Sequence, residues 1–156
     1  MLARQVEYAR RRGVPWGISE SAYNTMDLAL NYQYRAFGVP GLGLKPGLAD
    51  DLVVSPYSTA LALQVDAHAG MGNLRALMRE GLDGRFGFYE AVDYTRGRVP
   101  PGRRAVVVRA FMAHHQGMTL LALATCCAMA RWCAGSTRRR GSVRPSCCCR
   151  SVCRGR

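Results

Sequence analysis

The sequence predicts a mainly α-helical fold with long loops between the helices. Apolar residues recur at helical spacing in four segments, 1–12, 57–65, 67–80 and 107–124. Glycine and proline gather between them, with six glycines and three prolines from residue 13 to residue 55. Five aromatic residues share that stretch, and a long irregular segment of this kind is typical of a functional loop.

Local signals place the ends of these helices. Arginines crowd the end of the first helix before Gly13, where positive charge is favourable to the helix dipole. Ser55 and Pro56 form an N-cap and a first helical position for the second helix. Asp66 is expected to open the third helix, and Gly81 is expected to end it.

Charge and cysteine are unevenly distributed along the chain. The formal net charge is +12, but all seven cysteines and eight arginines lie after residue 124, with no acidic residue beside them. Residues 1–124 therefore carry 14 − 10 = +4 and no cysteine. A cysteine-free, mildly basic segment of this kind fits a reducing compartment, and its charge does not indicate nucleic acid as a partner. Lys45 and the glycines before it lack the Gly-Lys-Ser/Thr pattern of a phosphate loop.

Residues 125–156 differ from the body in composition and periodicity. Adjacent cysteines, as in Cys147-Cys148-Cys149, do not have the spacing that lets two thiolates face one metal ion. The codons of a Ser-Cys-Cys-Cys-Arg stretch, read one base earlier, can encode Glu-Leu-Leu-Leu-Gln. Our hypothesis is a one-base frameshift near Ala124, followed by a disordered tail over 125–156. Residues 1–124 are then a partial domain.

Two glutamates stand among aromatic residues and turns. Glu20 follows Trp16, and Glu90 follows Tyr89 in a glycine- and proline-rich stretch expected to be a loop or a short strand. Aromatic rings stack on sugar faces, and a pair of carboxyl groups cleaves glycosidic bonds. The pattern predicts a carbohydrate-active site with Glu20 and Glu90 as its catalytic pair. The alternative is that both are ordinary surface acids.

Five stretches of the chain resemble one known family. They are residues 16–24 (WGISESAYN), 31–45 (NYQYRAFGVPGLGLK), 51–57 (DLVVSPY), 87–95 (GFYEAVDYT) and 112–118 (MAHHQGM). In this order they resemble the glucoamylase-like domain of cyclic β-1,2-glucan synthases, over about residues 5–124. The resemblance implies part of an (α/α)6 barrel that cuts and rejoins β-1,2-glucan to close a ring, without a cofactor. Such a barrel needs on the order of 200 residues, so we expect a fragment.

The family also contains a membrane-embedded glycosyltransferase region and a phosphorylase-like region. The resemblance therefore implies a parent protein in the bacterial inner membrane, with this domain on its cytoplasmic side. The chain itself is expected to be cytoplasmic and to make no membrane contact. Its longest stretch free of charged and turn residues, 118–130, is shorter than the roughly 20 residues that a spanning helix needs.

Roles for individual residues follow from the resemblance and from the chemistry. The substrate-binding candidates are Trp16, Tyr23, Asn24, Tyr34, Arg35, Asp51, Tyr89, Asp93, His114, His115 and Gln116. Glu90 has the more apolar neighbours, and desolvation raises a carboxyl pKa, so we predict Glu90 as acid/base and Glu20 as nucleophile. Asp51 and Asp93 are the rivals for these two roles. The alternative for Arg35 is an ion pair with Asp27 or Asp51.

The two adjacent histidines are not expected to bind a metal together. On a helix they point about 100° apart, so one can reach the cleft while its neighbour is buried. The predicted activity is retaining transglycosylation, in which the two carboxyl groups lie roughly 5–5.5 Å apart. We expect this chain alone to be inactive. The alternatives are a non-catalytic carbohydrate-binding or structural fragment and an inverting endo-β-1,2-glucanase.

Overall fold

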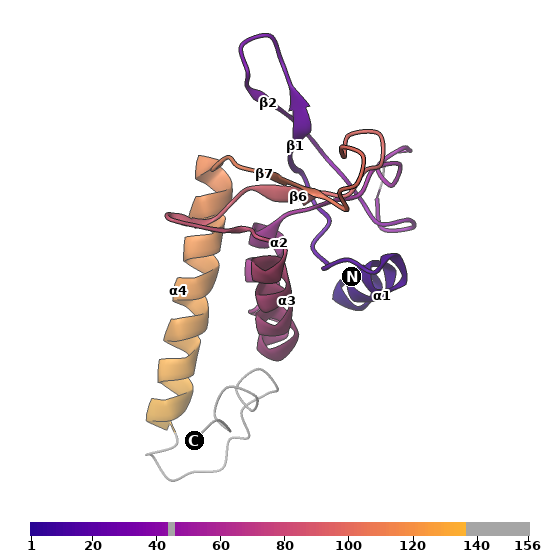
Figure 1. Ribbon diagram of the computed structural model, residues 1–156. Helices are drawn as coiled ribbons and strands as arrows, with labels where there is room; N and C mark the ends of the chain where they lie inside the picture. Colours follow the sequence, from indigo (N-terminus) through magenta and orange to yellow (C-terminus); the bar gives the residue numbers. More distant parts are fainter. Residues whose placement is uncertain (44–45, 137–156) are drawn as a thin grey trace.

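The computed structural model describes residues 1–43 and 46–136 (Figure 1). Within these residues the chain forms four α-helices and seven short β-strands. The helices are α1 (Leu2–Arg12), α2 (Pro56–Ala62), α3 (Ala67–Arg79) and α4 (Ala113–Ser136). The strands are β1 (Ser21–Met26), β2 (Tyr32–Arg35), β3 (Val53–Val54), β4 (Asp83–Gly84), β5 (Gly87–Phe88), β6 (Ala91–Asp93) and β7 (Val106–Val108). The prediction of a disordered tail over 125–156 is wrong for residues 125–136, which belong to α4, and its part from residue 137 lies outside the described residues.

The prediction of a mainly α-helical fold, as a fragment of an (α/α)6 barrel, is wrong. In the described residues the strands join into three antiparallel sheets, β1-β2, β3-β6-β7 and β4-β5. Segments expected to be irregular loops, or the start of a helix, supply these strands. The valines of β3, β6 and β7 are stiff at χ1, and this stiffness favours a strand once a neighbouring strand can pair with it.

The last helix shows this effect most clearly. Val106–Val108, expected at its start, instead forms β7 and pairs with β6, with Val107 opposite Val92. α4 begins only at Ala113 and continues past the predicted end to Ser136. Three consecutive β-branched residues are poor helix formers, and the free edge of β6 provides hydrogen-bond partners for their backbone N–H and C=O groups.

The predicted end of α1 and the predicted starts of α2 and α3 are confirmed, whereas α2 ends at Ala62 and not near Val65. α1 ends at Gly13, whose φ of 65° is left-handed and suits a residue without a Cβ atom. α2 begins at Pro56, directly after Ser55. α3 is capped by Asp66, whose side chain accepts a hydrogen bond from the backbone N–H of Ala69. These short-range signals depend on few neighbours, so they can be seen in the sequence.

Two substructures position the candidate site. α2 packs against α3 and against α4, and the β1-β2 hairpin packs against β6 and β7 near the beginning of α4. Figure 1 shows the hairpin projecting beyond the sheet, above the helices. The core lies between the hairpin base and the central sheet, where Val53, Val54 and Val92 are fully buried. In the part of the chain that the structure describes, no helix combines the length and the apolar character that crossing a membrane requires.

Candidate active site

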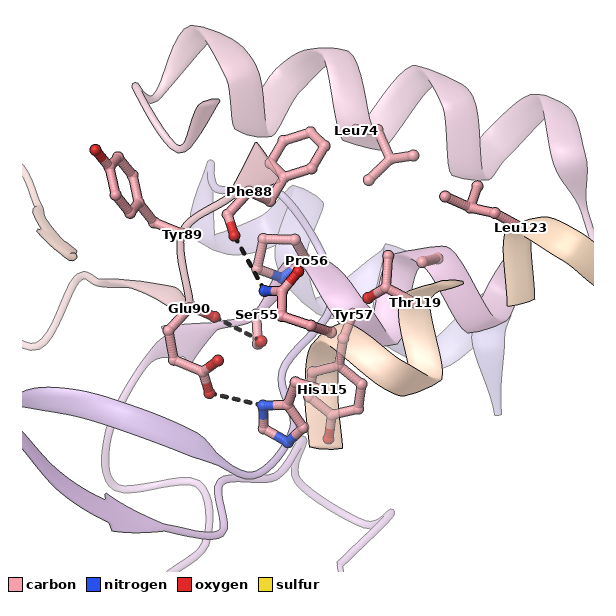
Figure 2. Close-up of a pocket in the computed structure, with 12 residues that line it drawn as sticks. Ser55, Pro56, Tyr57, Leu74, Phe88, Tyr89, Glu90, His115, Thr119 and Leu123 are labelled. Atoms are coloured by element: carbon pink, nitrogen blue, oxygen red, sulfur yellow. Dashed lines mark hydrogen bonds and ion pairs between the residues drawn. The ribbon is translucent and has the colours of Figure 1, made fainter. Parts of the chain in front are cut away.

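Glu90 stands between β5 and β6, and its backbone is held on both sides. Its N–H donates to the carbonyl oxygen of Ala110 at 3.0 Å, and the Ser55 hydroxyl donates to its carbonyl oxygen at 2.7 Å. The predicted place of Glu90 on a loop or short strand is confirmed. The residue is 1% exposed, so its carboxyl group is removed from water. Figure 2 shows this carboxyl group facing the His115 ring.

The Glu90 carboxyl group has few hydrogen-bond donors around it. Its Oε1 lies 2.7 Å from His115 Nδ1 and accepts the backbone N–H of Ala22 at 3.3 Å. Its Oε2 is buried and makes no hydrogen bond with the described residues. Burial raises the pKa of Glu90 to about 7, although the backbone N–H groups of Ala22 and Met112 oppose that shift. The carboxyl group therefore exchanges a proton near neutral pH.

His115 connects Glu90 with the exposed side of the site. Its ring is 1% exposed and stacks on the Tyr57 ring, with 3.8 Å between the centroids and 12° between the planes. Its second nitrogen, Nε2, lies 3.3 Å from the Tyr34 hydroxyl. Burial, with a smaller contribution from His114, lowers the pKa of His115 to about 4. The imidazole is therefore neutral near neutral pH.

Tyr34 and Glu20 form the exposed side. The β1-β2 hairpin brings the Tyr34 hydroxyl to within 3.2 Å of His114 Nε2, and both His114 and Glu20 are exposed. Burial raises the pKa of Tyr34 to about 12, and the charges of Glu20, Tyr57 and Glu90 add to this shift. Glu90 is connected to the Tyr34 hydroxyl through His115, and Glu20, 70 residues before Glu90 in the sequence, adds its charge at the same hydroxyl.

Tyr57 was not selected from the sequence, although it belongs to this group. Its hydroxyl shares a hydrogen bond with the Ser19 hydroxyl, and its ring carries the stacking contact with His115. Burial raises its pKa, Ser19 lowers it, and the charges of Glu20 and Glu90 raise it further. The signal that could have identified Tyr57 in the sequence was its place in the Asp51–Tyr57 stretch, one residue after the expected first residue of a helix.

Asp93, a rival for the catalytic pair, is instead held in an ion pair. It is 0% exposed, and Oδ2 accepts from Arg98 Nε at 2.7 Å and from the Asn24 backbone N–H at 3.1 Å. Oδ1 accepts from the Thr95 backbone N–H at 2.9 Å and from Arg98 at 3.3 Å. Both oxygens are therefore satisfied by the protein itself. The Asn24 side chain is occupied as well, because it donates to the Arg98 carbonyl oxygen.

Asp51 and Arg35 extend this network toward the surface. Asp51 Oδ2 accepts from Arg98 at 2.7 Å and also from Arg35, so the alternative of an Arg35–Asp51 ion pair is observed. The guanidinium carbons of Arg35 and Arg98 lie 5.4 and 4.8 Å from the Tyr23 ring centroid. Arg98, which the sequence did not single out, is the centre of the network. Its two carboxylate partners follow from pairing between distant segments.

The remaining sequence-predicted binding residues make their contacts with groups other than the Glu90 carboxyl group. Tyr89 packs against Phe111 with 5.3 Å between ring centroids, and the Gln116 amide donates to the Phe88 carbonyl oxygen at 3.3 Å. Trp16 is 8% exposed, and its backbone N–H donates to a side-chain oxygen of Asn73. These three side chains pack the fold around the site.

An enclosed cavity of about 60 Å³ lies behind Glu90 (Figure 2). It is lined by Ser55, Pro56, Tyr57, Ala60, Leu74, Phe88, Tyr89, Glu90, His115, Gln116, Thr119 and Leu123. Ligand sites typically enclose about 300–1,000 Å³, so this cavity is too small for a glucosyl unit. The exposed residues Tyr34, His114 and Glu20 offer a sugar a surface outside this cavity. No group of three or more His, Cys, Asp or Glu side chains within the described residues is arranged to hold a metal ion.

Comparisons with known proteins agree with a carbohydrate-processing fold. The Glycoamylase family, described as "Putative glucoamylase", matches residues 3–132, and this chain belongs to that family. The chain is 46% identical over 124 residues to the cyclic beta-(1,2)-glucan synthase NdvB of Rhizobium meliloti (strain 1021). That match covers 80% of this chain and 4% of the synthase. The family resemblance seen in the sequence is therefore confirmed.

A solved structure is also similar to the chain. It is the crystal structure of a "putative glucoamylase" from Bacteroides caccae, at 20% sequence identity and a TM-score of 0.46. The match covers 78% of this chain and 26% of that protein. The chain thus spans about a quarter of this structural relative and a small part of the synthase.

Proposed function

We propose that the site breaks and rejoins β-1,2-glucosidic bonds, as part of a longer glucan-cyclising protein. The support is membership of the glucoamylase-like family and 46% identity to a cyclic β-(1,2)-glucan synthase. The substrate is then a neutral polysaccharide. Its sugar rings bind across the exposed faces of Tyr34 and His114, because the cavity behind Glu90 cannot admit them.

One observation carries the proposal. The buried Glu90 carboxyl group lies 2.7 Å from His115 Nδ1, His115 Nε2 lies 3.3 Å from the Tyr34 hydroxyl, and the exposed Glu20 adds its charge at that hydroxyl. Glycoside chemistry needs two carboxyl groups, one of which holds a proton near neutral pH, as the raised pKa of Glu90 allows. We assign the proton-holding role to Glu90 and the nucleophile to Glu20. Asp93 and Asp51 take neither role, because Arg98 occupies both.

The reaction proceeds in two displacements. In the first, Glu20 forms a bond to the anomeric carbon, the glycosidic C–O bond breaks, and the leaving oxygen takes the proton supplied by Glu90. In the second, a glucan hydroxyl attacks the same carbon, its proton returns to Glu90, and Glu20 leaves as a carboxylate. When this hydroxyl belongs to the same glucan chain, the product is a ring. Water in its place gives hydrolysis.

The test combines binding and turnover. The chain itself is titrated with linear β-1,2-glucan, with a β-1,3-glucan of equal length as the control ligand. Turnover is measured in the Rhizobium meliloti synthase after its matching segment is replaced by residues 3–132 of this chain. We expect Glu20→Gln and Glu90→Gln each to lower ring formation by about 10²–10⁴-fold and to leave glucan binding intact. Glu7→Gln, an exposed change on α1, is the matched control. Retention of more than roughly a tenth of the activity would remove that glutamate from the pair.

The burial of Glu90 favours a second candidate, a site that binds glucan without cleaving it. Its carboxyl group is 1% exposed, whereas a direct proton donor must reach the glycosidic oxygen. Glucan binding by a chimera that makes no transfer product would support this candidate. An inverting endo-β-1,2-glucanase is distinguished by product analysis, because it would release linear sugars of inverted anomeric configuration.

A further inference from the structure

Glu90 cannot touch a sugar in this structure, yet it is connected to the surface. Its Oε2 is buried and has no hydrogen-bond partner in the part of the chain that the structure describes, and its Oε1 contacts the His115 ring and the Ala22 backbone. The shortest contact of the carboxyl group, 2.7 Å, is with His115 Nδ1. A proton held by Glu90 therefore has one well-aligned acceptor, and that acceptor is an imidazole.

The His115 imidazole also contacts Tyr34, which lies on the exposed side of the site. Its Nε2 lies 3.3 Å from the Tyr34 hydroxyl, and Tyr34 is 39% exposed. A neutral imidazole can accept a proton at one nitrogen while it gives up the proton on the other. A phenol hydroxyl can likewise accept and donate at once. The three groups form a continuous path from a buried carboxyl group to the face that a sugar can reach.

We propose that the Tyr34 hydroxyl is the group that meets the leaving glycosidic oxygen, and that His115 carries the proton of Glu90 to it. The inference rests on the proposed function for the identity of its substrate. The Glu90 carboxyl proton moves to His115 Nδ1, the Nε2 proton moves to the Tyr34 oxygen, and the Tyr34 proton moves to the leaving oxygen. Glu90 ends as a carboxylate, Tyr34 as a phenol and His115 as a neutral Nδ1–H tautomer. His115 and Tyr34 therefore carry no charge after the transfer.

The charged and titratable neighbours fit this role. Glu20, from the loop before β1, and His114, from α4, face the Tyr34 hydroxyl, while Tyr57, from α2, covers the His115 ring. Burial and the nearby negative groups keep Tyr34 a phenol, with a pKa of about 12, and burial keeps His115 neutral. Both residues therefore transfer protons and do not store charge. The stacking on Tyr57 holds the ring so that its two nitrogens face Glu90 and Tyr34.

The direct test is nuclear magnetic resonance of the whole chain with labelled histidine, tyrosine and glutamate. As the pH crosses the Glu90 pKa of about 7, we expect His115 to change from its Nε2–H to its Nδ1–H tautomer without becoming an imidazolium. The Glu90 carboxyl carbon and the Tyr34 ring carbon that bears the hydroxyl should move with the same midpoint. Glu90→Gln should abolish the transition in His115 and Tyr34. His68→Gln, an exposed change on α3, should leave it intact.

Two results would overturn the proton path. One is a single His115 tautomer across this pH range, and the other is a Tyr34 signal that does not respond to Glu90→Gln. Neither depends on glucan, so this outcome is separate from a failure of the proposed function. In the chimera, Tyr34→Phe should slow transfer of natural glucan by about 10²–10⁴-fold but spare a glucosyl fluoride donor, whose leaving group needs little protonation. Equal loss on both donors would assign Tyr34 to binding alone.

Discussion

Strand β6 lies between two buried carboxyl groups whose surroundings are opposite. Asp93, at its end, is 0% exposed and receives hydrogen bonds on both oxygens, two of them from Arg98. Glu90, just before the strand, is 1% exposed, contacts a neutral imidazole and leaves one oxygen without a hydrogen-bond partner among the described residues. Burial alone therefore does not distinguish the two carboxyl groups. The number and charge of their hydrogen-bond donors do, and they fit the structural role of Asp93 and the proton-holding role that we propose for Glu90.

The largest expected effect is the loss of stability in Asp93→Asn. This change leaves the largely buried Arg98 guanidinium without its main carboxylate partner, and breaking such a pair typically costs about 3–5 kcal/mol. Glu90→Gln, the matched change at the other end of β6, removes no ionic partner and should cost less than about 1 kcal/mol at neutral pH. Urea unfolding of both variants measures the difference. Equal losses would contradict the division between the two carboxyl groups.

The pH dependence of stability sharpens the comparison. The Glu90 pKa rises from 4.5 to about 7 on folding, so its contribution is present below 4.5 and is lost as the pH rises through 7. The His115 pKa falls from 6.5 to about 4, so its contribution is present above 6.5 and is lost as the pH falls through 4. Between pH 4.5 and pH 6.5, Glu90 makes the free energy of unfolding fall as the pH rises, whereas His115 makes it rise.

In Glu90→Gln, the pH dependence of the unfolding free energy that is due to His115 should therefore become visible. The unfolding free energy of the variant is expected to fall as the pH falls from 6.5 toward 4, whereas that of the wild type changes less. Each unit of pKa shift corresponds to about 1.4 kcal/mol, so the curves should separate by roughly 1–3 kcal/mol. Parallel curves, measured by urea unfolding at each pH, would show that Glu90 and His115 do not oppose each other.

A smaller effect is expected from Tyr57→Phe. The change removes the hydrogen bond with Ser19 but keeps the ring that stacks on His115. Loss of one such bond typically costs about 0.5–1.5 kcal/mol. The midpoint of the His115 tautomer change should stay where it is in the wild type. A shifted midpoint would mean that the Tyr57 hydroxyl itself belongs to the proton path.

The smallest effect should come from Arg35→Met. The Arg35 side chain is 44% exposed, and exposed ion pairs contribute about 0.2–1 kcal/mol. Asp51 keeps its contact with Arg98 in this variant. Thermal unfolding at low and at high salt should show nearly the same small difference in midpoint temperature between this variant and the wild type. A loss as large as that in Asp93→Asn would place the centre of the ion-pair network at Arg35 and not at Arg98.

The part of the fold that could be predicted is the part controlled by short-range interactions. Gly13, Pro56 and Asp66 mark helix ends because each acts on backbone groups within a few residues. The strands could not be predicted in this way. Val106–Val108 has no strand partner within a local window, and its pairing with β6 requires the intervening loop to close.

The sequence by itself determined the family and the helix ends at Gly13, Pro56 and Asp66, and it singled out the two glutamates of the proposed pair, because motifs and caps are local patterns. Only the tertiary structure decided that Asp93 is matched by Arg98 while Glu90 faces His115 and Tyr34. Burial and hydrogen-bond partners depend on which distant segments meet. A carboxylate supplied with enough donors stabilises the fold, whereas a buried one with too few keeps a proton near neutral pH.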